Sequence, residues 1–100
     1  MKASSILHVE NERAIVTEWR FEPGAETGHH VHALEYIVIP LTDGTLQVGG
    51  LETQLRAGEA YARPAGVAHN VVNTGAHEFR FVEVELKPTK FPLTPEGDLL

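Results

Sequence analysis

The sequence predicts an all-β fold, a sandwich or a barrel, and three observations lead to it. Apolar and polar residues alternate over short runs, which is the period of a strand with one buried face. Glycine, proline and other turn-forming residues separate these runs at intervals of about eight to twelve residues. No stretch shows the apolar periodicity of a helix. About eight short strands arranged in this way are typical of a small all-β domain.

The N-terminal half contains two clear strands. The stretch AIVTEWRF, residues 14–21, alternates regularly and is followed by the turn residues Pro23 and Gly24. Four of its side chains share one face: Ile15, Thr17, Trp19 and Phe21. The stretch EYIVIPL, residues 35–41, is a continuous apolar strand in which Pro40 indicates an edge or a bulge.

Two turns are expected to form hairpins. The TDG sequence at residues 42–44 predicts a hairpin after the apolar strand, and the GG pair at residues 49–50 predicts a two-residue hairpin between TLQV and LETQL. Further strands are predicted in EAYAR, VAHNVVN and EFRFVEVEL, which cover residues 59–63, 67–73 and 78–86.

The last of these strands is apolar on both faces. One face carries Phe79 and Phe81, and the other carries Val82, Val84 and Leu86. We expect one face to line the interior and the other to contact a second subunit. Together with the apolar start SSILHV, this predicts a homodimer, because a small β domain leaves sheet edges and apolar faces to cover.

Length and composition fit a single globular domain over residues 1–100, with 42% hydrophobic and 22% charged residues. We expect its core at residues 14–86, followed by an extended, proline-containing arm over residues 87–100. The net charge of −6, without a Lys- or Arg-rich stretch, argues against nucleic acid and anionic membrane as main partners. Residues 1–11 lack the apolar region of a signal peptide, and no apolar run could span a bilayer, so we expect a cytoplasmic protein.

The histidines form the most informative pattern. The chain has no cysteine, so any metal must be bound by His, Asp or Glu. Residues two apart in a strand point the same way, so His30 and His32 direct their rings at one point. His69 shares a strand face with apolar residues, including Val71, and a buried imidazole there needs a partner. A metal ion shared with His30 and His32 would supply that partner.

Two spaced motifs contain these histidines. Residues 24–32 read G-x5-H-x-H, with Glu35 following and Gly44 closing the strand. Residues 58–73 read G-x5-P-x-G-x2-H-x3-N without a gap. Together they are the two signature motifs of the cupin superfamily, which the chain resembles over residues 14–86. More narrowly, TEWRFEPGAETG, VIPLTDGTL, RPAGVAHNVVN and FVEVELK resemble the small single-domain cupins known as β-alanine degradation proteins.

The resemblance implies a jelly-roll barrel of about six to eight strands with a metal inside one end. The ligands that it implies are His30, His32, Glu35 and His69. Three neutral imidazoles and one carboxylate suit one divalent transition metal per chain, such as Fe, Mn, Ni, Cu or Zn.

The position of Glu35 is open from the residues alone. Glu35 follows His32 by three positions, so an unbroken strand would point the two side chains to opposite faces. A bend or bulge at residues 33–34 would turn the carboxylate toward the metal, and we expect this arrangement. Without it, Glu35 would point to solvent, and water would complete a site of three histidines.

Other residues have candidate roles beside the metal. Arg63 precedes Pro64 in the second motif and could pair with a substrate carboxylate, while Tyr36 and Tyr61 could offer hydroxyl groups to a pocket. The alternative for all three is a structural hydrogen bond or a dimer contact. Asn73 closes the second motif, and we expect it to satisfy backbone groups of a loop.

The preferred function is a metal-dependent enzyme acting on a small, carboxylate-bearing metabolite. A redox-active metal would make it a dioxygenase or another oxidoreductase, and a redox-inert metal would favour isomerase or lyase chemistry. The alternatives are a non-catalytic cupin that binds or senses a small molecule, and a structural relic without turnover, because a fold does not by itself imply a function.

Overall fold

Residues 1–88 are described by the computed structural model, so the predicted C-terminal arm lies almost entirely outside the described residues. Their strands are β1 (Ser4–Glu10), β2 (Ala14–Phe21), β3 (His30–Val31), β4 (Glu35–Pro40), β5 (Gly44–Val48), β6 (Leu51–Leu55), β7 (Tyr61–Arg63), β8 (Ala68–His69), β9 (Val71–Asn73) and β10 (Phe79–Leu86). This part of the chain contains no helix that could cross a membrane. The prediction of an all-β fold is confirmed.

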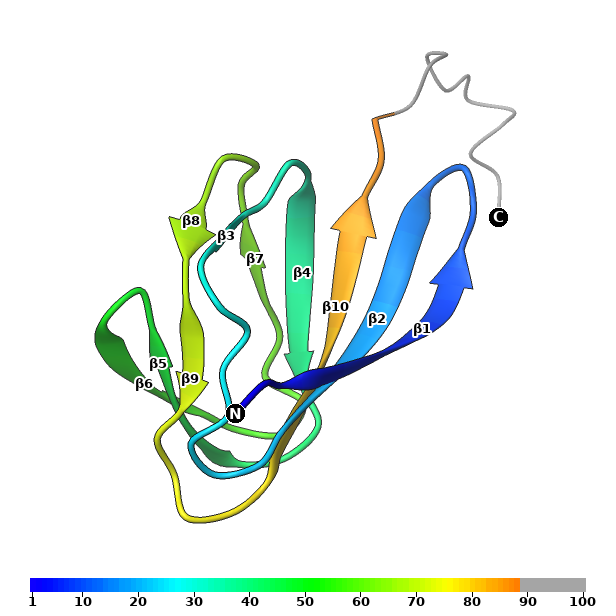
Figure 1. The fold of residues 1–100 in the computed structure, drawn as a ribbon. Helices are drawn as coiled ribbons and strands as arrows, with labels where there is room; N and C mark the ends of the chain where they lie inside the picture. Colours follow the sequence, from blue (N-terminus) through cyan, green and yellow to red (C-terminus); the bar gives the residue numbers. More distant parts are fainter. Residues whose placement is uncertain (89–100) are drawn as a thin grey trace.

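The strands form three antiparallel sheets. A five-stranded sheet has the order β1-β2-β10-β4-β7, a three-stranded sheet has the order β6-β5-β9, and β3 pairs with β8 alone. In Figure 1 the five-stranded sheet lies opposite the three-stranded one, and the β3–β8 pair lies at one end. The central strands of these two sheets therefore have an inner face directed toward the opposite sheet and an outer face directed away from it.

The core lies between the inner faces, as the alternation predicts. Phe21, Phe79 and Phe81 come from the large sheet, and Leu46 and Val71 meet them from the small one. The rings of Phe21 and Phe81 are stacked, with centroids 5.6 Å apart. Phe79 and Phe81 are thus on the inner face, and Val82, Val84 and Leu86 alternate with them on the outer face.

The two predicted hairpins have different outcomes. Gly49 and Gly50 do join β5 to β6, and their φ values of 57° and 84° are the positive ones that a two-residue hairpin of type I′ requires. The hairpin at residues 42–44 is wrong, because β4 and β5 belong to different sheets. Strand β4 already has β10 and β7 as neighbours, so the turn carries the chain across to the other sheet.

Asn73 connects three parts of the chain, and its expected structural role is confirmed. Its side chain is 1% exposed. Its Nδ2 donates hydrogen bonds to the carbonyl oxygens of Phe21, at 3.0 Å, and His77, at 2.8 Å. Its Oδ1 accepts one from the backbone N–H of Gly75, at 2.9 Å. The end of β2, strand β9 and the loop before β10 are held together in this way.

The outer face of the five-stranded sheet carries an apolar patch beside a charged group that includes Arg20, Arg80 and Glu18. Cross-strand pairs join Val82 to Ile39 and Val84 to Ile37, and all four side chains are half-buried. Glu18 of β2 interrupts this face and is held by Arg20, at 2.8 Å, and by His8, at 3.0 Å. The hydrogen bond from Arg20 keeps the pKa of Glu18 below its usual value. Beyond Glu18, Ile6 of β1 lies on the same face and is 39% exposed.

Candidate metal centre and ligand cavity

The short β3–β8 pair brings the two histidine motifs together. His30 lies directly across from His69 in the antiparallel register. Two backbone hydrogen bonds continue the pairing beyond the strands, from the His32 N–H to the Val67 carbonyl and from the Gly66 N–H to the His32 carbonyl. Residues that are 37 positions apart, such as His32 and His69, therefore become neighbours.

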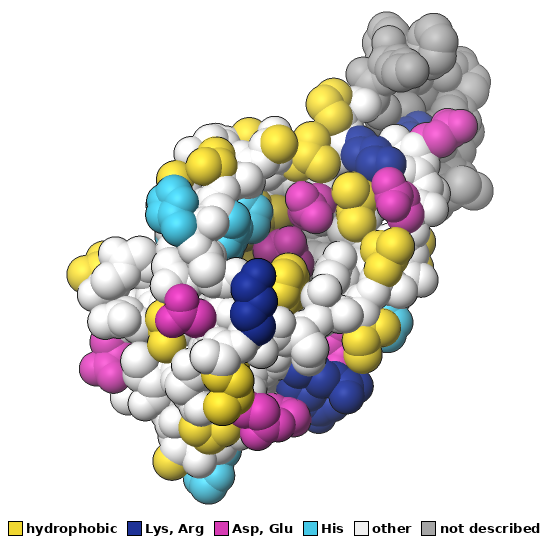
Figure 2. Space-filling view, viewed as in Figure 1, with side chains coloured by type: hydrophobic (Ala, Val, Ile, Leu, Met, Phe, Trp, Pro, Cys, Tyr) yellow, Lys and Arg dark blue, Asp and Glu magenta, His cyan; other side chains and the backbone are white. Residues whose placement is uncertain are grey.

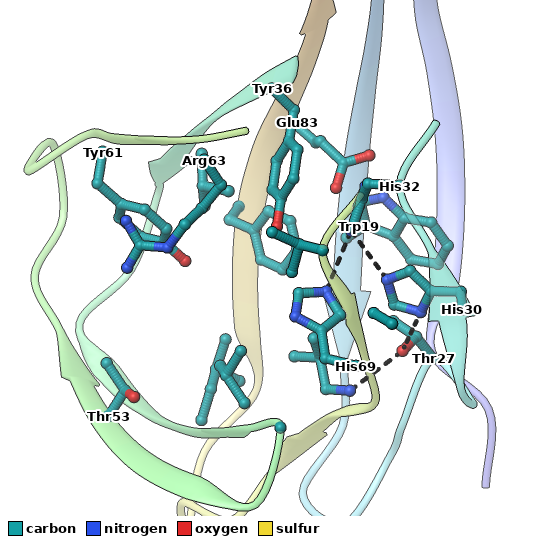
Figure 3. A pocket seen from close by; sticks show the side chains of 18 of the residues that line it. Trp19, Thr27, His30, His32, Tyr36, Thr53, Tyr61, Arg63, His69 and Glu83 are labelled. Atoms are coloured by element: carbon teal, nitrogen blue, oxygen red, sulfur yellow. Dashed lines mark hydrogen bonds between the residues drawn. The ribbon is translucent and has the colours of Figure 1, made fainter. Parts of the chain in front are cut away.

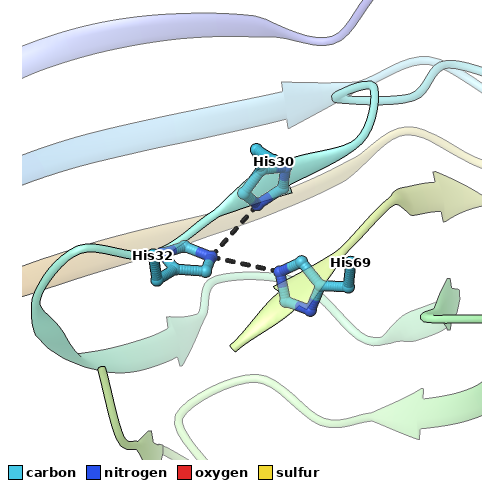
Figure 4. A group of neighbouring side chains, drawn as sticks. All are labelled: His30, His32 and His69. Atoms are coloured by element: carbon cyan, nitrogen blue, oxygen red, sulfur yellow. Dashed lines mark hydrogen bonds between the residues drawn. The ribbon is translucent and has the colours of Figure 1, made fainter. Parts of the chain in front are cut away.

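The three imidazole rings converge through their Nε2 atoms (Figure 4). The Nε2 of His32 lies 3.0 Å from that of His30 and 3.1 Å from that of His69. Two adjacent ligands at right angles around one ion, with metal–nitrogen bonds of about 2.1 Å, would be about 3.0 Å apart. The three rings also form a group that could hold a metal ion. The donor set therefore fits a divalent transition metal.

The surroundings of His30 determine which of its nitrogens is free. Its Nδ1 lies 2.9 Å from the carbonyl oxygen of Gly28, which can only accept, so Nδ1 carries the proton. In the neutral ring, Nε2 then has a lone pair directed at the other histidines. The loop is fixed by Asn70, whose Oδ1 accepts a hydrogen bond from the Gly28 N–H at 3.0 Å.

Burial keeps two of the rings neutral. His32 is 7% exposed, and burial lowers its pKa to about 4, with the charges of His30 and His69 acting in the same direction. Burial also lowers the pKa of His69, again with help from His30. His32 and His69 therefore resist protonation at neutral pH, and a metal needs deprotonated imidazoles.

Glu35 does not lie where the sequence motif led us to expect it. The chain does bend at residues 33–34, but β4 then turns Tyr36 inward, where it is 2% exposed. Alternation leaves Glu35 exposed on the opposite side, paired with Leu86 of β10. The structure therefore does not bring Glu35 to the three histidines.

Two other carboxylates lie near the histidines instead. Glu83 and Glu85 of β10 form a group with His32, in which one ligand atom of each residue lies within 4.8 Å of the others. Sequence reasoning missed them, although they alternate with Val82 and Val84 and therefore share a strand face with the buried phenylalanines of β10. The alternation that puts Phe79 and Phe81 on the inner face, extended two and four residues beyond Phe81, is the signal that identifies them.

The histidines, the two carboxylates and all three pocket candidates line one cavity of about 830 Å³ between the sheets. Figure 2 shows a hollow in this side of the molecule, with histidine, acidic and basic side chains around it. Most of the lining is aromatic or aliphatic, and it includes Trp19, Val38, Leu46, Val48, Leu55 and Phe81. A largely apolar cavity with a few polar groups is the usual form of a small-molecule site.

The three pocket candidates lie close together in this cavity (Figure 3). Tyr36 stacks on His32, with ring centroids 3.9 Å apart and an angle of 20° between the rings. The guanidinium carbon of Arg63 lies 4.6 Å from the centre of the Tyr61 ring. Burial raises the pKa of both tyrosines, so their hydroxyls stay protonated at neutral pH.

Glu83 is the most perturbed acid of the cavity. Burial raises its pKa to about 7, and the neighbouring charge of Glu85 acts in the same direction. The indole N–H of Trp19 acts against this rise, although Trp19 Nε1 is buried and forms no regular hydrogen bond within the described residues. A neutral and an ionised Glu83 are therefore both accessible near neutral pH.

The comparison with known proteins agrees with this architecture. The family model described as "Cupin domain" matches residues 17–85, and the chain therefore belongs to the cupin family. It is also similar to the β-alanine degradation protein BauB of Pseudomonas aeruginosa. The two are 54% identical over 90 residues, which cover 86% of this chain and 95% of the relative.

Solved structures confirm the jelly-roll fold. A cupin domain protein of Bordetella pertussis superposes with a TM-score of 0.84 at 46% identity, over 87% of this chain and 95% of that protein. The protein TT1209 of Thermus thermophilus superposes with a TM-score of 0.69 at 28% identity, over 87% of this chain and 86% of that protein.

Proposed function

We propose that this cupin is a metal-dependent enzyme that acts on a small, carboxylate-bearing metabolite. The observation that carries the proposal is the convergence of three imidazole nitrogens at one side of a cavity of about 830 Å³. Metal centres held by three protein ligands leave positions open for water or substrate. The similarity to a protein named for β-alanine degradation supports a small metabolite as the substrate.

The residues have separate roles in this proposal. His30, His32 and His69 hold the metal, and Tyr36 keeps the His32 ring in place by stacking on it. Arg63 binds the substrate carboxylate, because its planar guanidinium offers several donors and remains charged at any physiological pH. When bound, a redox-active metal would supply oxidation chemistry, and a redox-inert one would polarise a carbonyl group.

The metal centre is tested by a pair of histidine variants. We expect His69→Ala to lose the stoichiometric metal and some thermal stability, because one of three converging ligands is removed. His29→Ala is the matched control, since His29 is exposed and lies outside the group of three. Elemental analysis of the purified proteins is the measurement, and full metal content in His69→Ala would contradict the assignment.

Turnover is tested on the metal-loaded protein. We expect the iron form to consume oxygen with small carboxylate substrates if the enzyme is an oxidoreductase. If oxygen is not consumed, substrate loss followed by NMR with the zinc or manganese form would identify isomerase or lyase chemistry. A protein that binds metal and ligand but shows neither reaction would be a binding or sensor cupin.

We also propose that the outer face of the five-stranded sheet pairs with a second copy of the chain. Its half-buried residues Ile37, Ile39, Val82 and Val84 form an apolar patch, and Glu18 separates this patch from the exposed side chain of Ile6 on β1. An apolar sheet face of this kind is usually covered by another element or another chain.

A further inference from the structure

The register of the five-stranded sheet places charges of opposite sign on its inner face. Glu85 of β10 pairs with Tyr36 of β4, and Tyr36 pairs in turn with Arg63 of β7. In the neighbouring row, Glu83 pairs with Val38, which pairs with Tyr61. Adjacent strands are about 4.8 Å apart, so the backbones of β10 and β7 are separated by about 10 Å across the cavity wall.

These charges have no partners in the described part of the protein. Glu83 and Glu85 accept no ion pair from a Lys, Arg or His of residues 1–88. Arg63 donates to the carbonyl oxygen of Ala62, at 2.9 Å, and stacks on Tyr61, but it makes no salt bridge within this range. The cavity thus has an acidic side and a basic side, with the Tyr36 ring between them.

We propose that the cavity binds a small zwitterion, with its ammonium group at Glu83 and Glu85 and its carboxylate group at Arg63. This inference rests on the proposed function and specifies the substrate class of the same site. A simple carboxylate would satisfy Arg63 but would offer no N–H donor to Glu83 and Glu85, whose carboxylates lie close to His32 and would otherwise have only a metal ion held there as a compensating charge. An ammonium group offers them three N–H donors and a compensating charge.

The aromatic walls favour the same ligand. Tyr36 and Trp19 line the cavity beside the carboxylates, and an ammonium group is attracted to the faces of such rings. The apolar remainder of the cavity accepts a short carbon chain between the two charged groups. The attraction between the charged groups of the ligand and those of the protein is also stronger in a largely apolar cavity than in water.

The experiment is a calorimetric titration of the metal-loaded protein with β-alanine, propanoate and propylamine, which have the same number of carbon atoms. We expect β-alanine to bind at least about tenfold more tightly than either singly charged molecule, since hydrogen bonds to charged groups carry this much affinity. Glu83→Gln and Glu85→Gln together should remove the preference for β-alanine over propanoate. Arg63→Met should weaken β-alanine and propanoate alike.

Matched controls separate these effects from a general change in charge. Glu52→Gln and Arg56→Met alter exposed residues outside the cavity and should leave all three affinities unchanged. Circular dichroism and metal content are recorded for every variant, so that only folded, metal-loaded proteins are compared. If the double variant does not fold, Glu85→Gln alone should still reduce the preference.

The outcomes distinguish this inference from the proposed function. Propanoate binding as tightly as β-alanine, no binding of any of the three molecules, or an unchanged preference in the folded glutamate variants would each overturn the zwitterion site while leaving the metal centre intact. Tight β-alanine binding without turnover of any substrate would uphold the zwitterion site and contradict the enzyme.

Discussion

Glu35 and Glu83 show how the alternation of side chains within each strand decides which carboxylate reaches a site. Glu35 begins β4 and is exposed, whereas Glu83 lies on the inner face of β10 beside His32. The motif spacing predicts that Glu35 lies near the histidines, but the strand geometry places Glu83 there instead. The number of residues that separate a carboxylate from the histidines in the sequence thus does not show whether it lies near them in the fold.

Glu35→Gln tests this directly. We expect unchanged metal content and a change in unfolding free energy below about 0.5 kcal/mol, because the side chain is exposed and no cation within the described residues pairs with it. Metal titration and urea unfolding are the measurements. A marked loss of metal affinity would show that Glu35 moves to the site when the ion binds.

Glu83→Gln should change how stability depends on pH. Folding raises the pKa of Glu83 from 4.5 to about 7, so the folded state holds this proton more tightly than the unfolded state. Its contribution to stability is complete below pH 4.5 and is lost as the pH rises through about 7. Glutamine cannot ionise, so the stability of the variant relative to the wild type should increase between these two pH values.

Urea unfolding of the metal-free proteins across this pH range is the measurement. His32 has a lowered pKa, so its contribution to stability is lost as the pH falls from 6.5 toward 4, which is the opposite direction. This contribution is present in both proteins and cancels in the difference, apart from the direct coupling of His32 to the nearby Glu83. A difference that stays constant with pH would show that Glu83 has an ordinary pKa in the folded state.

At the scale of strands and turns, Gly44 makes a close contact with Phe79 that the spacing of the sequence motif does not reveal. It begins β5, and a Cβ atom built there would lie 2.5 Å from Cδ2 of the buried Phe79 ring. We expect Gly44→Ala to destabilise the protein by about 1–3 kcal/mol through overpacking. In a protein that already carries Phe79→Leu, Gly44→Ala should cost less stability than it does in the wild type. Strict additivity of the two substitutions in a double-mutant cycle would contradict the clash.

The strands and the histidines were predictable because their signals are local. The alternation in residues 14–21 and the glycine pair at residues 49–50 dictate a strand and a hairpin without reference to the rest of the chain. The side chains of His30 and His32 were also correctly predicted to point the same way, because residues two apart in a strand share a face. The partners of β4 and β5 and the proximity of Glu83 to His32 were not predictable, because they depend on pairing between distant segments.

For the whole molecule, the outer face of the large sheet leads to the prediction of a homodimer. Ile6→Lys would place a charge on this face, at a side chain that is already 39% exposed in the single chain. We expect a wild-type dimer at micromolar concentration and at least about tenfold weaker association in the variant, because an added ammonium group must lose its hydration to be buried at an interface. Leu51→Lys is the control, since Leu51 is 74% exposed on β6 of the other sheet.

Light scattering with size-exclusion chromatography measures this association. A wild-type protein that is monomeric at micromolar concentration would end the proposal. Equal weakening by Ile6→Lys and Leu51→Lys would place the contact on a different surface. Thermal unfolding of both variants checks that the single chain is still folded.

The place of β10 in the sheet order has a consequence for how the chain is made. β10 is the last of the described strands along the chain, yet it lies between β2 and β4 in the middle of the five-stranded sheet. A ribosome adds about 5–20 residues per second, so β2 and β4 emerge seconds before the strand that joins them. Until then, each of them has an unpaired edge and exposed apolar side chains. The sheet, and with it the acidic side of the cavity, can therefore be completed only after residue 86 has been synthesised, through contacts of long sequence separation that form slowly.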